Sequence, residues 1–195
     1  MKPLGFMPKI VVLLSCFFLT SCLLPGMIPL DQEQEPEVTE GPMPTMEKDA
    51  EKLLETLRSG EFVYLEQLAK EEYTDEDYAK PGTITYTVNI TDNKPTYFHY
   101  GWCTSTEEIL QQNFEHIRLS MLFNGKELGE DVVHGVSSTR PDGWVCLEFG
   151  ALMSDWVPGE YELEAVATFD EQINDGGADF EAGDYKFVYN VTVEE

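Results

Sequence analysis

The chain has 195 residues, with 12 Lys and Arg against 37 Asp and Glu, which gives a formal charge of −25. Because 42% of its residues are hydrophobic and 12% are aromatic, it can bury a core, and wholesale disorder is excluded. Nucleic acid is excluded as a partner, since its phosphates would repel so acidic a chain.

Residues 1–21 have the layout of a secretory signal. Lys2 and Lys9 form a short positive region, and an apolar stretch follows at 10–19. A bilayer span needs roughly 20 apolar residues, so this stretch is too short to predict a stable transmembrane helix. Small residues then lead to Cys22.

The quartet Leu19-Thr20-Ser21-Cys22 resembles the lipobox of bacterial lipoprotein precursors. In that family the Cys thiol receives a diacylglycerol, and cleavage falls just before it. The resemblance implies that 1–21 is a lipoprotein signal peptide and that acylated Cys22 anchors the chain to a lipid bilayer, on the extracytoplasmic face of a cell membrane. The alternative is an ordinary signal peptide followed by an incidental Cys.

Export also accounts for the other cysteines. Cys16 would be discarded with the signal, which leaves Cys103 and Cys146. In an oxidising compartment two such cysteines are expected to pair. A disulfide here would close a loop of about 44 residues and stabilise the fold by about 4 kcal/mol on the chain-entropy estimate.

Residues 22–45, which begin with the lipidated Cys, read as an acidic tether because five of the eleven prolines fall here without an apolar period. Residues 46–80 then predict two short amphipathic helices, separated by Ser59-Gly60 and docked on the domain C-terminal to them. The two apolar stripes are Met46, Ala50, Leu53, Leu54 and Leu57, then Phe62, Leu65, Leu68, Ala69 and Tyr73.

Residues 82–195 predict a mainly β domain, because apolar residues here alternate with polar ones. About seven short strands are expected, over 84–90, 97–102, 117–123, 132–136, 144–149, 161–169 and 185–193. Asn124-Gly125 predicts a hairpin, and Arg140-Pro141-Asp142-Gly143 a turn. A capping box of Ser105 and Glu108 predicts a short helix that runs to about Phe114.

Two strand entries share Gly, an acid and then an aromatic residue: Gly159-Glu160-Tyr161 and Gly183-Asp184-Tyr185. They resemble the late-strand entries of bacterial immunoglobulin-like and fibronectin-like domains. The resemblance implies an immunoglobulin-like antiparallel β-sandwich. Neither Trp102 nor Trp144 lies midway between the cysteines, which departs from the antibody pattern. Only the architecture is therefore carried over, and no binding residue.

The acidic, Gly-rich segment 170–184 is a candidate calcium loop, since Ca²⁺ takes 6–8 oxygen ligands. The candidate ligands are Asp170, Asn174, Asp175, Asp179, Glu181 and Asp184. The spacing does not match an EF-hand, and the alternative is a solvated acidic loop.

Aromatic side chains occupy both faces of the segment 97–102. Phe98, Tyr100 and Trp102 would face one way, and Tyr97 and His99 the other. An exposed second face could bind a sugar or a protein, so Tyr97 and His99 are candidate ligand-binding residues. The alternative is that the two N-terminal helices cover this face.

The sequence contains no HExxH, GxSxG or P-loop pattern, and no cofactor is indicated beyond possible calcium. A non-catalytic domain is expected. The hypothesis is a membrane-anchored lipoprotein that binds an extracellular protein or a glycan. The alternatives are a structural or accessory subunit of a surface complex without its own ligand, or a calcium-stabilised surface domain.

Overall fold

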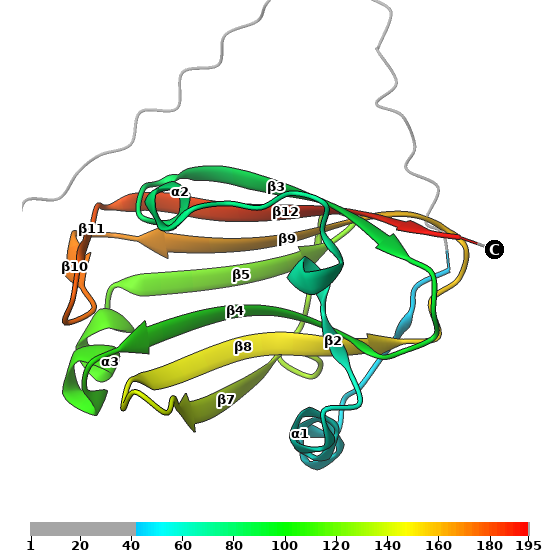
Figure 1. Cartoon of the computed structure of the whole chain (residues 1–195), viewed down its shortest axis with the longest axis horizontal. Coiled ribbons are helices and arrows are strands. Elements are labelled where there is room, and N and C mark those ends of the chain that lie inside the picture. The colour runs from blue at the N-terminus through cyan, green and yellow to red at the C-terminus, as the bar shows by residue number, and fades with distance from the viewer. Residues whose placement is uncertain (1–41, 195) are drawn as a thin grey trace, which may run out of the picture. The chain divides into compact units, whose positions relative to one another are not determined.

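The structure, a computed structural model, describes residues 42–194, and these are mainly β (Figure 1). The predicted signal peptide, Cys22 and the tether up to residue 41 lie outside the described residues. Within 42–194, no helix is both long and apolar enough to cross a bilayer. Each of the seven predicted strand segments overlaps a strand of the structure.

The first sheet, here called the β4 sheet, is built around two long antiparallel strands. β4 pairs with β8 along nine residues, from Thr96 opposite Met153 to Thr104 opposite Val145. β7 and β1 pair with different parts of β8, and β2 runs parallel to the start of β4. The strands span Thr45–Met46 (β1), Val63–Tyr64 (β2), Thr96–Thr104 (β4), His134–Thr139 (β7) and Val145–Ser154 (β8).

The second sheet, here called the β12 sheet, has the order β3-β12-β9-β5-β6. Its strands span Gly82–Ile90 (β3), Ile117–Phe123 (β5), Lys126–Glu127 (β6), Gly159–Phe169 (β9) and Gly183–Val193 (β12). The expectation of a wholly antiparallel sandwich is wrong here, because β3 runs parallel to β12. After β3 the chain crosses to the other sheet, so β3 and β12 are not joined by a hairpin and can point the same way.

The core lies between the two sheets and is rich in aromatic side chains. Phe98 of β4 packs edge-on against Tyr189 of β12, with ring centroids 5.6 Å apart. Trp102 and Phe169 make a similar contact at 5.3 Å. The inward residues of β3, β9 and β12 follow the predicted alternation, since buried positions recur at every second residue except at the half-buried Phe187 of β12.

The first predicted helix is present as α1 (Ala50–Ser59), which is shorter than its stripe suggested. Asp49 caps its start by accepting hydrogen bonds from two backbone N–H groups. Gly60 ends it in the left-handed conformation, with a φ of 71°. Met46, expected inside the helix, instead belongs to β1 and pairs with Met153.

The second predicted helix is wrong. The segment from Phe62 to Tyr73 forms β2, a 3₁₀ turn η1 (Leu65–Leu68) and an extended stretch, and a short helix α2 follows at Asp75–Tyr78. The apolar residues of 62–73 have helical spacing, but they pack against two different sheets. η1 packs against both β3 and β4, so tertiary packing overrides the local period.

The extended stretch 69–73 covers the outer edge of β3. Ala69 bridges Val88, and the N–H of Lys70 donates to the carbonyl of Thr87. Side chains of this stretch also bond to the backbone of β3. The Glu71 carboxylate accepts a hydrogen bond from the N–H of Thr87 at 2.6 Å. The Tyr73 hydroxyl donates to the carbonyl of Thr85 and accepts from its N–H.

Three shorter features connect the strands. Asn124 and Gly125 both have positive φ and join β5 to β6, as the hairpin signal predicted. Helix α3 (Glu107–Asn113) is present, but its cap is Thr106 and not Ser105. Thr106 takes that place because its hydroxyl accepts from the N–H of Ile109. The remaining strands, β10 (Ile173–Asn174) and β11 (Asp179–Phe180), form a small hairpin.

Candidate functional site

A pocket of about 260 Å³ opens at one side of the two sheets, next to η1. After Tyr97, the edge of β4 that faces away from β8 has no partner strand among the described residues. The pocket opens into the space between the sheets along this edge. The pocket is lined by Glu66, Tyr78, Tyr86, His99, Tyr100, Gly101, Phe187 and Tyr189. These come from η1, α2, β3, β4 and β12.

Aromatic rings make up most of the wall. Tyr86 and Tyr189 stack with centroids 4.8 Å apart. Phe187 lies 6.3 Å from the ring of Tyr78 and 6.0 Å from that of Tyr100. The hydroxyls of Tyr78 and Tyr86 are hydrogen-bonded at 2.7 Å, which ties α2 to the β12 sheet.

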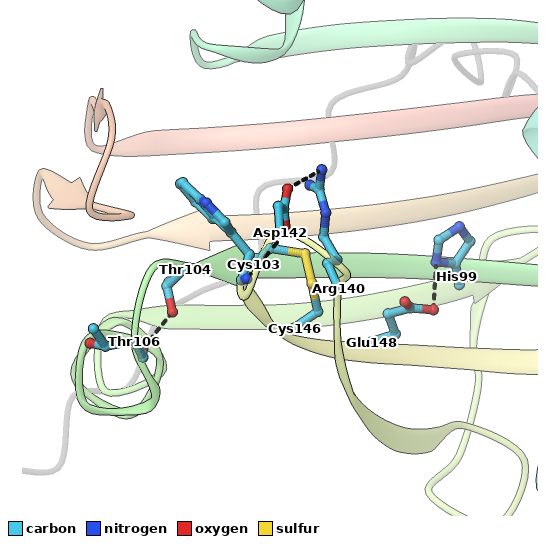
Figure 2. The surroundings of a disulfide bond; sticks show 9 residues. His99, Cys103, Thr104, Thr106, Arg140, Asp142, Cys146 and Glu148 are labelled. Atoms are coloured by element: carbon cyan, nitrogen blue, oxygen red, sulfur yellow. Dashed lines mark hydrogen bonds and ion pairs between the residues drawn. A yellow bond between two sulfur atoms is a disulfide. The ribbon is translucent and has the colours of Figure 1, made fainter.

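Glu66 and His99 form the polar wall. Oε1 of Glu66 and Nε2 of His99 are 2.9 Å apart. The second oxygen, Oε2, is buried and has no hydrogen-bond partner among the described residues. On the other side of the imidazole, Nδ1 of His99 lies 3.7 Å from Oε2 of Glu148, as Figure 2 shows. The imidazole therefore lies between two carboxylates.

Two tyrosine hydroxyls of the pocket, those of Tyr86 and Tyr189, are held in their neutral form. Burial raises the pKa of Tyr86 well above its ordinary value, and the hydrogen bond with Tyr78 and the charge of Glu66 raise it further. Burial likewise raises the pKa of Tyr189 well above the usual range, with Glu66 adding to the effect. These hydroxyls therefore serve as hydrogen-bonding groups and not as anions.

Of the two candidate ligand-binding residues, only His99 lines this pocket. Tyr97 is fully buried in a small cluster with Leu53 of α1 and Leu152 of β8. Tyr97 is therefore covered, but by α1 and by Phe62 and Tyr64 at β2, and not by two helices as the alternative expected. His99 keeps 17% of its side chain exposed. Its ring stacks on that of Tyr97, with centroids 5.4 Å apart, and lies tilted against that of Tyr64 at 4.7 Å.

The candidate calcium ligands do not converge on one point. Asp170 contacts His116 and Arg118, Asn174 donates to Asp179, Asp175 accepts from the backbone of Gly177 and Ala178, and Asp184 accepts from Thr168. Over residues 42–194 no group of three or more His, Cys, Asp or Glu side chains is arranged to hold a metal ion. These carboxylates thus have separate partners, and the backbone carbonyl of Glu181 accepts a hydrogen bond from the Tyr185 hydroxyl.

The predicted disulfide between Cys103 and Cys146 is present (Figure 2). The two cysteines face each other on β4 and β8, with Cα atoms 4.0 Å apart. The bond thus links neighbouring strands of one sheet. Arg140 and Asp142 form an ion pair in the turn between β7 and β8, and Gly143 has the positive φ of the predicted turn.

A second, larger hollow of about 460 Å³ lies beside β5 and β7, and its wall is mainly apolar. Phe114, Leu119 and Phe149 contribute to it, with Glu127 and Glu130 among its polar residues.

The sequence did not identify most of the pocket beside His99. Alternation places Tyr86, Tyr100 and Tyr189 on inward faces, which is where core residues also lie. Glu66 carries no signal at all, because it falls on the polar side of the wrongly predicted helix. No family model matches the chain, and no curated protein is significantly similar to it.

Proposed function

We propose that the chain is an extracytoplasmic lipoprotein, anchored to a membrane by acylated Cys22 after removal of residues 1–21. The lipobox Leu19-Thr20-Ser21-Cys22 is the observation that carries this proposal. The disulfide between Cys103 and Cys146 supports it, because such bonds persist in oxidising compartments outside the cytoplasm.

The anchor is tested by labelling bacteria that express the protein with a fatty-acid analogue. Label is expected in the wild type and in Cys16→Ala, a matched control within the signal, and is expected to be lost in Cys22→Ala. Equal label in the wild type and in Cys22→Ala would overturn the anchor.

We further propose that the domain is an immunoglobulin-like sandwich. The order β4-β8-β7 in one sheet and β12-β9-β5 in the other supports this, since it corresponds to strands B-E-D and G-F-C of that fold. The disulfide departs from the antibody pattern because it lies within one sheet. Amide contacts across β4 and β9 in NMR spectra would contradict the assignment.

The domain is proposed to bind a ligand presented by an extracellular protein or a glycan, without catalysis. The pocket beside His99 carries this proposal, because aromatic walls with a few polar groups are typical of binding sites. Pockets for drug-sized ligands begin at about 300 Å³, so this one suits a single side chain, a sugar unit or a head group.

The test compares two exposed residues. Tyr78 is a wall of the pocket and 37% exposed, whereas Val157 is 36% exposed and outside it. Binding of the purified protein to arrays of glycans and of secreted proteins is expected to be lost in Tyr78→Ala and kept in Val157→Ala. Unchanged binding in Tyr78→Ala would exclude the pocket and favour an accessory role without a ligand of its own.

A further inference from the structure

The pocket beside His99 combines aromatic rings with negative charge and contains no basic Lys or Arg in its lining. Two carboxylates, Glu66 and Glu148, contact the single imidazole of His99. Acidic groups therefore outnumber basic ones around His99 by two to one. An anionic ligand would be repelled, and a cation would be attracted.

Glu66 carries one oxygen that the protein does not use. Oε1 faces His99, but Oε2 is buried without a hydrogen-bond partner among the described residues. A buried, unpaired carboxylate oxygen costs free energy, and a positive charge held beside Glu66 in the pocket would offset that cost.

The rings supply a second attraction for the same kind of group. The face of a tyrosine ring is electron-rich and attracts a cation within about 6 Å of its centre. Four tyrosines and Phe187 line the pocket. Burial keeps the hydroxyls of Tyr86 and Tyr189 neutral by raising their pKa, so these two rings add no anion. Aromatic walls with a carboxylate are the arrangement that suits an organic ammonium ion.

We propose that this pocket binds a cationic ammonium group, supplied by a lysine side chain or by a quaternary ammonium head group. The inference rests on the proposed binding function, because it names the ligand class of the same site. A neutral sugar would use the rings equally well but would gain nothing from the excess of carboxylate.

The test is calorimetric titration of the mature protein in a non-ionic polyoxyethylene detergent. Four probes are used: choline, n-butylammonium, the uncharged choline isostere 3,3-dimethylbutan-1-ol, and methyl glucoside. The better of the two cations is expected to bind about tenfold more tightly than the uncharged isostere. Preference for choline points to a head group, and preference for n-butylammonium points to a lysine side chain.

Two variants of matched charge locate the effect. Glu66→Gln keeps the shape of the side chain and is expected to weaken cation binding about tenfold, because it removes the charge partner of the ligand. Glu72→Gln removes an exposed carboxylate outside the pocket lining and is expected to leave binding unchanged. Thermal unfolding of both variants confirms that they are folded.

The outcomes separate this inference from the proposed function. If the isostere or methyl glucoside binds as tightly as the cations, the ammonium inference is overturned while the pocket remains a binding site. Equal weakening by Glu66→Gln and Glu72→Gln would mean that only overall charge matters, and also overturns it. If none of the four probes binds, the inference fails, and the comparison of Tyr78→Ala with Val157→Ala decides the binding function alone.

Discussion

Removal of the disulfide tests how far the cross-link, and not the packing, stabilises the domain. Cys103 and Cys146 are 43 residues apart in sequence and face each other on β4 and β8. On the chain-entropy estimate, opening a loop of this length costs about 4 kcal/mol. For a chain of this size 1 kcal/mol shifts the melting temperature by about 2–4 °C, so a decrease of about 8–16 °C is expected.

The assay is thermal and urea unfolding of the wild type and of the double variant Cys103→Ala/Cys146→Ala, followed by tryptophan fluorescence. The slope of unfolding free energy against urea should also rise, because the unfolded chain without the cross-link exposes more surface. Reduced wild-type protein is the matched control, since it lacks the bond but keeps both sulfur atoms. A loss below about 1 kcal/mol in the reduced protein would refute the entropic reasoning and assign the effect of the variant to packing at Cys146.

Three further predictions concern stability. Leu53→Ala should cost about 2–5 kcal/mol by urea unfolding, because Leu53 is fully buried against Tyr97. Gly60→Ala should cost about 1 kcal/mol by the same assay, since the φ of 71° strains any side chain. The hydrogen bond with Asp170, with smaller charge effects from neighbouring carboxylates, raises the pKa of His116. The stabilisation from protonated His116 is fully present below the unfolded pKa of about 6.5 and is lost as the pH rises through the folded pKa. His116→Gln should therefore flatten the dependence of stability on pH over that window.

Each of these three predictions has a control or a result that would contradict it. Glu55→Ala, at an exposed position of α1, should leave stability almost unchanged, because alanine favours a helix and no buried contact is lost. An equal loss in both variants would show that packing at Leu53 is not the cause. For Gly60, a stability gain in the alanine variant would contradict the strain argument. For His116, an NMR titration should give a pKa above the usual value, and a pKa at or below it would remove the basis of the pH effect.

The strands could be predicted because each one has one face in the core and so alternates in sequence. β3 shows this best, with Ile84, Tyr86, Val88 and Ile90 all buried. The pairing of β3 with β12 could not be predicted, because these strands are far apart in sequence and alternation says nothing of direction.

The pocket could not be predicted because five separate segments contribute to it. His99 was identified only because aromatic residues fell on both faces of its strand. Glu66 was assigned to a helix that does not form, since the same apolar spacing also fits a turn that packs between two sheets. A local pattern cannot distinguish the two, because the choice depends on residues of β3 and β4.

The cover over β3 has a consequence for how copies of this protein meet. An uncovered strand of nine residues would offer its backbone to a second copy and so favour stacking of molecules into a shared sheet. Glu71 and Tyr73 already occupy the backbone groups of Thr85 and Thr87. If the proposed anchor confines many copies to one membrane plane, where they collide often, this cover would keep them separate. The stretch 69–73 that covers this edge also connects η1 to α2, and both contribute residues to the pocket. A change that detached the stretch would therefore disrupt the pocket and, at the same time, expose the edge of β3 to pairing with another molecule.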